Sequence, residues 1–178
     1  MDEAVTFHYD VGSPWCWLAG ERVTHVLGLV PVWQPVLASG LGASLDADRA
    51  AVDAAAGAQG LPSPRWPEPF PFDSELAMLA ATFAKGSGRA VAFSLAAMRQ
   101  AFAGARDLSV TDNVLIAAAA CELHPRAVLK GVETASVRNA LRDATAAAAA
   151  AGVADLPAVS VGGRVFTGPS AVEEAAAA

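Results

Sequence analysis

The chain has 178 residues, of which 54% are hydrophobic and 17% are charged, and its formal net charge is −6 at pH 7. These values predict one folded domain, or one with a sizeable insertion, and exclude a disordered chain. The acidic balance argues against nucleic-acid binding, which needs clustered lysine and arginine. No apolar run approaches the ~20 residues that span a membrane. The start of the chain lacks the features of a signal peptide, so we expect a cytoplasmic protein with no membrane partner.

The two cysteines, Cys16 and Cys121, are too few for a disulfide framework and suit a reducing compartment. No group of residues has the spacing of metal ligands, so we expect no metal. The histidines are expected to be packing or surface residues: His8 on a strand, His25 on a helix, and His124 as a partner of a helix C-terminus.

The first predicted elements are a strand, a helix and a second strand. Alternation over residues 5–9 predicts a strand with Val5, Phe7 and Tyr9 on one face. Ser13 is a suitable N-cap for a helix with Pro14 at its first position, and this helix is expected to end near Gly28. Residues 29–36 predict a second strand, at an edge because they contain two prolines.

A block of helices interrupted by one rigid loop follows. The five prolines of residues 61–72 exclude a regular element and predict a loop whose three large aromatic residues pack against the body or over a pocket. Hydrophobic spacing and capping residues predict helices over about 46–56, 73–86, 91–102, 111–123 and 133–151.

The end of the chain predicts two strands, residues 156–161 and 164–166, joined by the turn Gly162-Gly163 and followed by a short helix. The order β-α-β, helices, β-β-α predicts an α/β, thioredoxin-like fold with an inserted all-helical domain. We assign residues 1–38 and 152–178 to the thioredoxin-like domain, and residues 39–151 to the inserted helical domain.

Three stretches resemble a known family. Residues 12–19, G-S-P-W-C-W-L-A, are similar to S-P-Y-x-Y-L-A, and residues 60–73 are similar to a G-L-P…F-P-x-N loop. Residues 152–168, G-V-A-D-L-P-A-V-S-V-G-G-R-V-F-T-G, are similar to G-V-x-G-V-P-T-F-x-V-x-G-x-x-F-x-G. The chain resembles the DsbA-like branch of the thioredoxin superfamily, and within it is most like 2-hydroxychromene-2-carboxylate isomerases and kappa-class glutathione transferases.

The cap position of the first helix carries the predicted chemistry. A thiol placed against a helix N-terminus has a lowered pKa, and its thiolate is the reactive species. Here the cap is Ser13, which has no redox chemistry but can donate a hydrogen bond to a thiolate brought by a small-molecule cofactor. The resemblance implies this role for Ser13, with glutathione as the thiol.

The resemblance also implies a cis bond before Pro157, which leaves the backbone of Leu156 to pair with the cofactor. It implies a small aromatic or electrophilic substrate that is isomerised or conjugated, and a homodimer is compatible with it. The candidate catalytic residues are Ser13 and Cys16. The candidate cofactor-binding residues are Ser13, Pro14, Trp15, Asp73, Leu156, Pro157 and Ser170.

Two positions depart from the family's pattern. Asp73 replaces an asparagine, and Ser170-Ala171 replace an Asp-Arg pair that holds the γ-glutamyl end of glutathione in relatives. Because the loss of an arginine weakens carboxylate binding, a sugar-based thiol such as mycothiol is an alternative cofactor.

Each candidate residue also has a structural interpretation. Ser13 can be an N-cap alone, and Cys16, one turn into the helix, can be a small hydrophobic residue or a thiol that forms mixed disulfides. Two alternative functions follow: a thiol-disulfide oxidoreductase that acts through Cys16, and a degenerate binding protein without catalysis.

Overall fold

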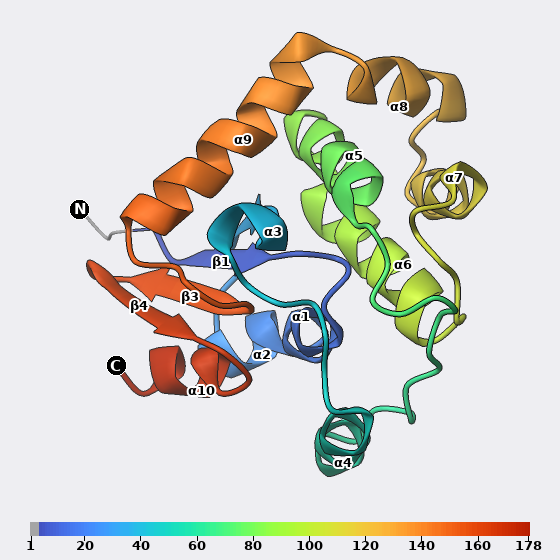
Figure 1. Ribbon diagram of the computed structural model, residues 1–178. Coiled ribbons are helices and arrows are strands. Elements are labelled where there is room, and N and C mark those ends of the chain that lie inside the picture. Colours follow the sequence, from blue (N-terminus) through green and yellow to red (C-terminus); the bar gives the residue numbers. More distant parts are fainter. Residues whose placement is uncertain (1–3) are drawn as a thin grey trace.

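A single four-stranded sheet organises the computed structural model, which describes residues 4–178. Its strands are β1 (Thr6–Tyr9), β2 (Val32–Pro35), β3 (Ala158–Val161) and β4 (Arg164–Thr167), in the order β2-β1-β3-β4. β1 pairs in parallel with β2 and antiparallel with β3, and β3 and β4 form an antiparallel hairpin. The predicted α/β, thioredoxin-like order of elements is confirmed, with a block of helices between the second and third strands (Figure 1).

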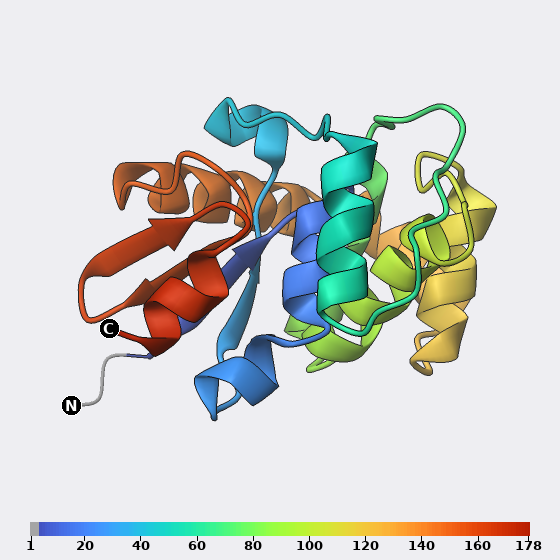
Figure 2. The same ribbon diagram turned by 90° about the horizontal axis from the view of Figure 1, so that it is seen from below.

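Helices cover both faces of this sheet. Helices α1 (Pro14–Gly20), α2 (Val23–Leu27) and α10 (Ala171–Ala176) lie below the sheet in Figure 1, and the long α9 (Ala135–Ala150) lies above it. Figure 2 shows the same arrangement from below, with α10 and α2 nearer the viewer than α9. The remaining helices are α3 (Ala38–Leu41), α4 (Arg49–Ala58), α5 (Glu75–Gly86), α6 (Ala90–Phe102), α7 (Thr111–Ala120) and α8 (Pro125–Val132).

Several predicted boundaries are corrected. The helix expected to end near Gly28 is two helices, α1 and α2. Helix α2 ends at Leu27, and Gly28 is its C-cap, with a φ of 67° that suits glycine. Helices α3 and α8 were not predicted. The sequence predicts that a helix ends just before Pro125, but Pro125 begins α8, because proline is favoured at a first helical position. The His124 side chain accepts a hydrogen bond from the Arg126 N–H and so caps the start of α8 rather than the end of a helix.

The core packs against the first strand on the face that its alternation predicts. Phe7 and Tyr9 are fully buried and lie against Trp33 of β2, with ring centroids 4.9 and 5.2 Å from the Trp33 ring. The Tyr9 hydroxyl lies 2.6 Å from the Ser94 hydroxyl of α6. This contact ties the sheet to the helical block.

The proline-rich loop over residues 61–72 has no regular secondary structure, as predicted. Trp66 and Phe70 pack edge-on against Phe102 of α6, with ring centroids 6.2 and 6.1 Å from the Phe102 ring. Phe72 is buried in the core. The aromatic residues of this loop therefore pack against the body of the protein.

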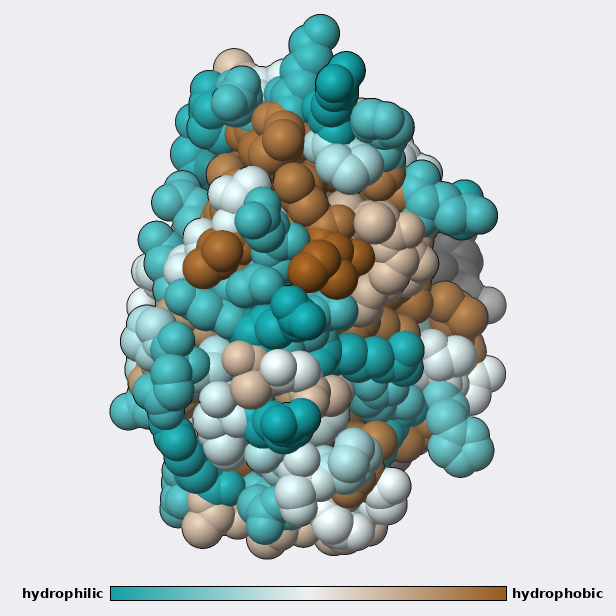
Figure 3. Space-filling model, turned by 90° about the vertical axis from the view of Figure 1, so that its right-hand side faces the viewer, coloured by the Kyte–Doolittle hydropathy of each residue, from teal (hydrophilic) through white to brown (hydrophobic). Residues whose placement is uncertain are grey.

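Helices α7 and α8 form the right-hand side of Figure 1. In the space-filling view of that side, hydrophobic residues are scattered among hydrophilic ones (Figure 3). Exposed Val110, Ile116 and Leu129 belong to this part of the chain. Single exposed apolar residues of this kind are normal on a protein surface. Among the residues that the structure describes, no helix combines the length and the hydrophobicity needed to cross a bilayer.

His8 lies on the face of β1 opposite Phe7 and Tyr9, and it is 8% exposed. Its Nε2 is 2.9 Å from the Ser160 hydroxyl on β3, and its Nδ1 is buried with no hydrogen-bond partner within residues 4–178. Burial, and then the charge of Lys85, lower the pKa of His8 from 6.5 to about 4. The imidazole is therefore neutral at physiological pH.

We expect His8 to make the protein less stable as the pH falls from 6.5 to 4. In this window the unfolded chain binds a proton on the imidazole that the native state does not, so the free energy of unfolding decreases, by about 2 kcal/mol after allowance for solvent screening. Urea denaturation across this pH range measures the effect. His8→Gln should flatten the slope and the exposed control His25→Gln should keep it; an unchanged slope in His8→Gln contradicts the assignment.

Candidate functional site

The turn between β1 and α1 is built around the carboxylate of Asp10, which is 0% exposed. One oxygen accepts a hydrogen bond from the Gly12 N–H at 2.9 Å. The other accepts bonds from the N–H of Ala38, at the start of α3, and from the Ser74 hydroxyl, just before α5, both at 3.0 Å. Burial raises the pKa of Asp10, and these three bonds oppose the shift. Asp10 is not among the predicted site residues, although an acid between a buried strand and the start of a helix is a visible signal in the sequence.

Ser13 is the N-cap of α1, as the sequence predicts. Its N–H donates to the Asp10 carbonyl at 3.1 Å, and its hydroxyl oxygen accepts a hydrogen bond from the Cys16 N–H at 3.2 Å. Capping uses an oxygen lone pair, so the hydroxyl proton can still be donated, either to the neighbouring Cys16 sulfur or to a second partner. The structural and the functional interpretations of Ser13 are therefore compatible. The residue is 4% exposed, so a partner can reach the hydroxyl only over a small area.

The space around the turn is narrow. A Cβ atom added to Gly12 would lie 3.0 Å from the Ser74 Cβ and 3.0 Å from the Leu45 Cδ1, closer than ordinary packing allows. Leu45, in the segment before α4, thus packs directly against the turn that ends in Ser13. A side chain larger than glycine at position 12 would push these segments apart.

Cys16 is 0% exposed inside α1. Burial raises the pKa of its thiol to about 12, and hydrogen bonding to the Asp10 backbone and the Ser13 side chain lowers it by less. The carboxylates of Asp10 and Asp155 raise it further. Because the thiolate is the reactive form of cysteine, this thiol behaves as a small hydrophobic group in the native state.

Leu156 and Pro157 lie beside this turn. Their peptide bond is cis, and Ala158, the next residue, pairs with His8, two residues before Asp10. The Leu156 N–H donates to the Asp155 carboxylate at 2.8 Å. Of the Leu156 backbone that is expected to pair with a cofactor, the N–H is therefore already bonded to an acid of the chain itself.

Asp155 is not among the residues that the sequence patterns predict for the site. The available signal was its place in the third resembling stretch, where Asp155 stands at a glycine of the family's pattern. An acidic side chain here puts a negative charge beside Leu156 and close enough to Cys16 to affect the pKa of that thiol.

The remaining predicted residues are less central. Pro14 is buried at the start of α1, and Trp15 is half-buried against the core. Asp73 is exposed, and its carboxylate accepts a hydrogen bond at 2.9 Å from the N–H of Glu75, the first residue of α5. Ser170 is exposed at the start of α10 and makes no side-chain capping bond there. Ser13 thus bonds to Cys16, and Cys16 lies within reach of the charge of Asp155, the residue before Leu156 and Pro157, while the side chains of Asp73 and Ser170 bond elsewhere or not at all.

Residues that could bind a metal ion do not cluster in the described part of the chain. Within residues 4–178, no three histidine, cysteine, aspartate or glutamate side chains are grouped so that they could hold a metal ion.

Comparison with known proteins identifies the fold. No protein-family model and no curated protein sequence matches the chain. Among solved structures, a 2-hydroxychromene-2-carboxylate isomerase aligns with a TM-score of 0.81 and 13% identity, over 94% of this chain and 90% of its own. The chain has a DsbA-like thioredoxin fold. The fold implied by the three resembling stretches is therefore confirmed.

Two further structures share this fold. A protein from Streptomyces coelicolor, provisionally assigned as a DsbA oxidoreductase, aligns with a TM-score of 0.73 and 20% identity, over 97% of this chain and 88% of its own. One from Nitrosomonas europaea, provisionally assigned as a protein disulfide isomerase, has a TM-score of 0.70 and 14% identity, over 98% of this chain and 95% of its own. At these identities the likeness concerns the DsbA-like fold.

Replacing Asp10 by alanine should lower the free energy of unfolding by about 3 kcal/mol, because three buried donors lose their acceptor. Urea denaturation measures the change, with the exposed Asp143→Ala as control, for which we expect a change below ~0.5 kcal/mol. If Asp10→Ala does not fold, Ser74→Ala tests the same contact with an expected loss of about 1 kcal/mol. Wild-type stability in both variants contradicts the role given to Asp10.

In a Cys121→Ala background, iodoacetamide should alkylate Cys16 at least about 100-fold more slowly in the native state than in urea, because burial suppresses the thiolate. Mass spectrometry after timed quenching measures both rates. Oxidised glutathione should likewise leave no adduct on native Cys16. Native labelling within about tenfold of the unfolded rate would show that the thiol is accessible.

Proposed function

We propose that this protein is an enzyme that activates the thiol of a small-molecule cofactor through Ser13, for isomerisation or conjugation of an electrophilic substrate. The supporting observation is the division of roles between two neighbouring residues. Ser13 keeps a hydroxyl proton that capping does not use, whereas Cys16 is buried with a pKa raised to about 12. Ser13 follows β1, and β1 pairs with β3, which begins directly after Leu156 and Pro157. The Cys16 thiol is thus unsuited to thiol-disulfide exchange, whereas the Ser13 hydroxyl can donate a hydrogen bond to the thiol of a bound cofactor.

The residues of the turn have distinct tasks in this proposal. Ser13 donates a hydrogen bond to the sulfur and thereby favours its ionised form. Asp10 fixes the turn in two ways: its carboxylate accepts a hydrogen bond from the Gly12 N–H, and its backbone carbonyl accepts one from the Ser13 N–H. The Ser13 hydroxyl therefore needs little reorganisation when a thiolate forms. A bound thiol supplies the nucleophile, and an isomerisation of this kind consumes no oxidant or reductant.

The residues around Ser13 suit the thiol group of a cofactor, but they do not suit the carboxylates and peptide groups of glutathione. Glutathione carries two carboxylates, and the acids Asp73 and Asp155 stand near the places where its peptide was expected to bind. The Leu156 N–H, which would pair with that peptide, is bonded to Asp155 at 2.8 Å. Ser170 offers no cation to hold a carboxylate. We therefore favour a low-molecular-weight thiol without carboxylates, such as a sugar-based thiol of the mycothiol kind.

The fold is compatible with more than one activity. One structure of this fold is an isomerase, and two others are provisionally assigned to disulfide chemistry. The burial of Cys16 favours the first activity over the second for this chain. The cytoplasmic location, the homodimer and the division at residues 38/39 and 151/152 stay predictions.

Ser13→Ala should reduce thiol-dependent turnover of a general electrophile, such as 1-chloro-2,4-dinitrobenzene, by about 10–100-fold, because the thiolate loses a charge-assisted hydrogen bond. The assay compares mycothiol and glutathione as thiol donors, with kcat/KM as the readout. Thr134→Ala is the matched control, because it removes the N-cap of α9 without touching the Ser13 turn. Turnover that persists at the wild-type rate in a folded Ser13→Ala protein contradicts the proposed mechanism.

A second candidate is a binding protein without catalysis, which the small exposure of Ser13 and the occupied Leu156 N–H favour. Calorimetric titration with mycothiol and glutathione separates the two candidates. Binding with thiol-dependent turnover supports the enzyme, and binding with no turnover of any electrophile supports the binding protein.

A further inference from the structure

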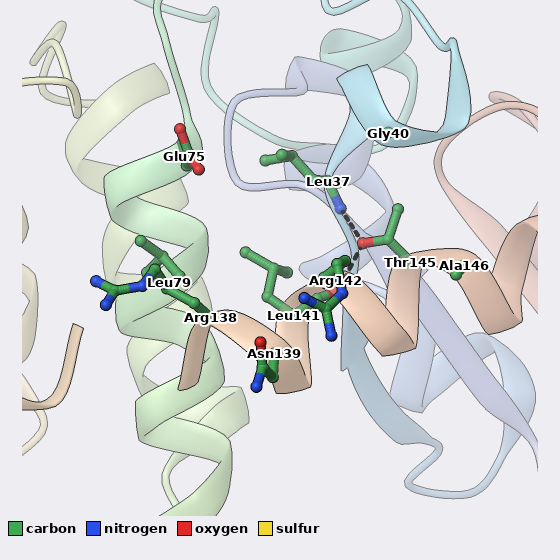
Figure 4. A pocket seen from close by; sticks show the side chains of 10 residues that line it. All are labelled: Leu37, Gly40, Glu75, Leu79, Arg138, Asn139, Leu141, Arg142, Thr145 and Ala146. Atoms are coloured by element: carbon green, nitrogen blue, oxygen red, sulfur yellow. Dashed lines mark hydrogen bonds between the residues drawn. The ribbon is translucent and has the colours of Figure 1, made fainter. Parts of the chain in front are cut away.

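A cavity of about 520 Å³ lies between α3, α5 and the first three turns of α9 (Figure 4). Its volume is in the range of small-molecule sites. Its lining residues include none of the candidate residues around Ser13. Two neighbouring residues separate the two places: the Leu37 N–H donates to the Thr145 hydroxyl on the cavity side at 3.0 Å, and the Ala38 N–H donates to Asp10.

The inner wall of this cavity is apolar. Leu37 comes from the start of α3, Leu79 from α5 and Leu141 from α9. In Figure 4 the side chains of Leu37 and Leu141 extend into the space between the three helices. The Thr145 hydroxyl accepts from the Leu37 N–H and donates to the Leu141 carbonyl, so its hydrogen-bonding capacity is spent within the wall. An apolar ligand body can therefore lie against this wall without leaving a polar group unsatisfied.

The outer rim carries two arginines one helical turn apart on α9, Arg138 and Arg142, with Asn139 between them. The Arg142 guanidinium bonds to Asp143, its exposed neighbour, at 2.9 Å, and such surface pairs are weak. The Arg138 guanidinium makes no hydrogen bond or ion pair with residues 4–178. In a chain of net charge −6, this places two cations at the mouth of one apolar cavity.

Glu75 lies at the start of α5, on the opposite side of the cavity from Arg142 in Figure 4. Its carboxylate disfavours a second negative charge on a ligand, and it can accept a hydrogen bond from a donor group. The cavity is thus cationic at the α9 rim, apolar inside and anionic at the α5 end.

We propose that this cavity binds a small apolar monocarboxylate. The carboxylate pairs with one of the two guanidiniums, Arg138 or Arg142, which lie apart in Figure 4 and each offer the planar, multi-donor geometry that carboxylates prefer. The apolar body lies over Leu37, Leu79 and Leu141. The site is separate from the Ser13 turn, and the proposal holds whether or not Ser13 activates a thiol.

Titration of ¹⁵N-labelled full-length protein by NMR tests this site. The probes are 2-naphthoate and octanoate, and the neutral control is 2-naphthamide, which has the same shape as naphthoate without its charge. At least one acid should shift the amides of Gly40, Arg138 and Ala146, and naphthamide should bind at least about tenfold more weakly than naphthoate.

The double variant Arg138→Gln/Arg142→Gln should weaken the binding of the acid at least about tenfold, and the matched control Arg126→Gln, on the exposed side of α8, should leave it unchanged. The spectrum of each variant without ligand should match that of the wild type except near the substituted residues, which verifies that the variants remain folded. The proposal is overturned if neither acid shifts these amides at 10 mM, if naphthoate and naphthamide bind equally, or if the double variant binds like the wild type.

Discussion

The carboxylate of Asp10 joins segments that lie 28 and 64 residues away along the chain, through Ala38 and Ser74. Ala38 and Ser74 belong to the helices between β2 and β3. The third partner of the carboxylate, Gly12, lies in the turn that presents Ser13. A buried carboxylate without partners is costly, so the three segments are held together by the need to satisfy one side chain. The Asp10 carboxylate therefore helps to fix the position of the candidate site relative to the helices between β2 and β3.

The turn that carries Asp10 and Gly12 is also tightly packed. Gly12 approaches Ser74 and Leu45 too closely for a larger residue, and the turn leads directly into Ser13 and the buried start of α1. The result is a rigid cap with little open space. Rigidity suits the positioning of a single hydrogen-bond donor, while the small exposure of Ser13 restricts what can reach it.

Much of this architecture could be predicted from the sequence. The alternation of Phe7 and Tyr9, the Ser13-Pro14 cap and the Gly162-Gly163 turn are local signals, and each predicts its element. Helix α8 was missed because a proline was taken as an end rather than a start. Asp10 and Asp155 were missed because their roles depend on partners distant in sequence or on side-chain direction, which local patterns do not contain.

The identity of the thiol is less predictable for the same reason. In the proposed function the turn around Ser13 receives a sulfur, but the groups that would select the rest of a cofactor come from several loops. At these loops the chain has the acids Asp73 and Asp155 and the neutral Ser170, where an amino-acid ligand would need cations or free backbone donors. The departure from the family's pattern is therefore one of charge, and it affects selectivity more than the fold.

The central claim, that Ser13 stabilises the thiolate of a bound cofactor, is tested most directly by the absorbance of thiolate near 240 nm. Mycothiol is titrated with pH in the presence of the wild-type protein and of Ser13→Ala, each in a background without Cys16 and Cys121. With Ser13 present, we expect the pKa of the bound mycothiol thiol to be lower than that of free mycothiol. In Ser13→Ala the pKa of the bound thiol should return toward the free value. An unchanged pKa of the bound thiol with Ser13 present would contradict it.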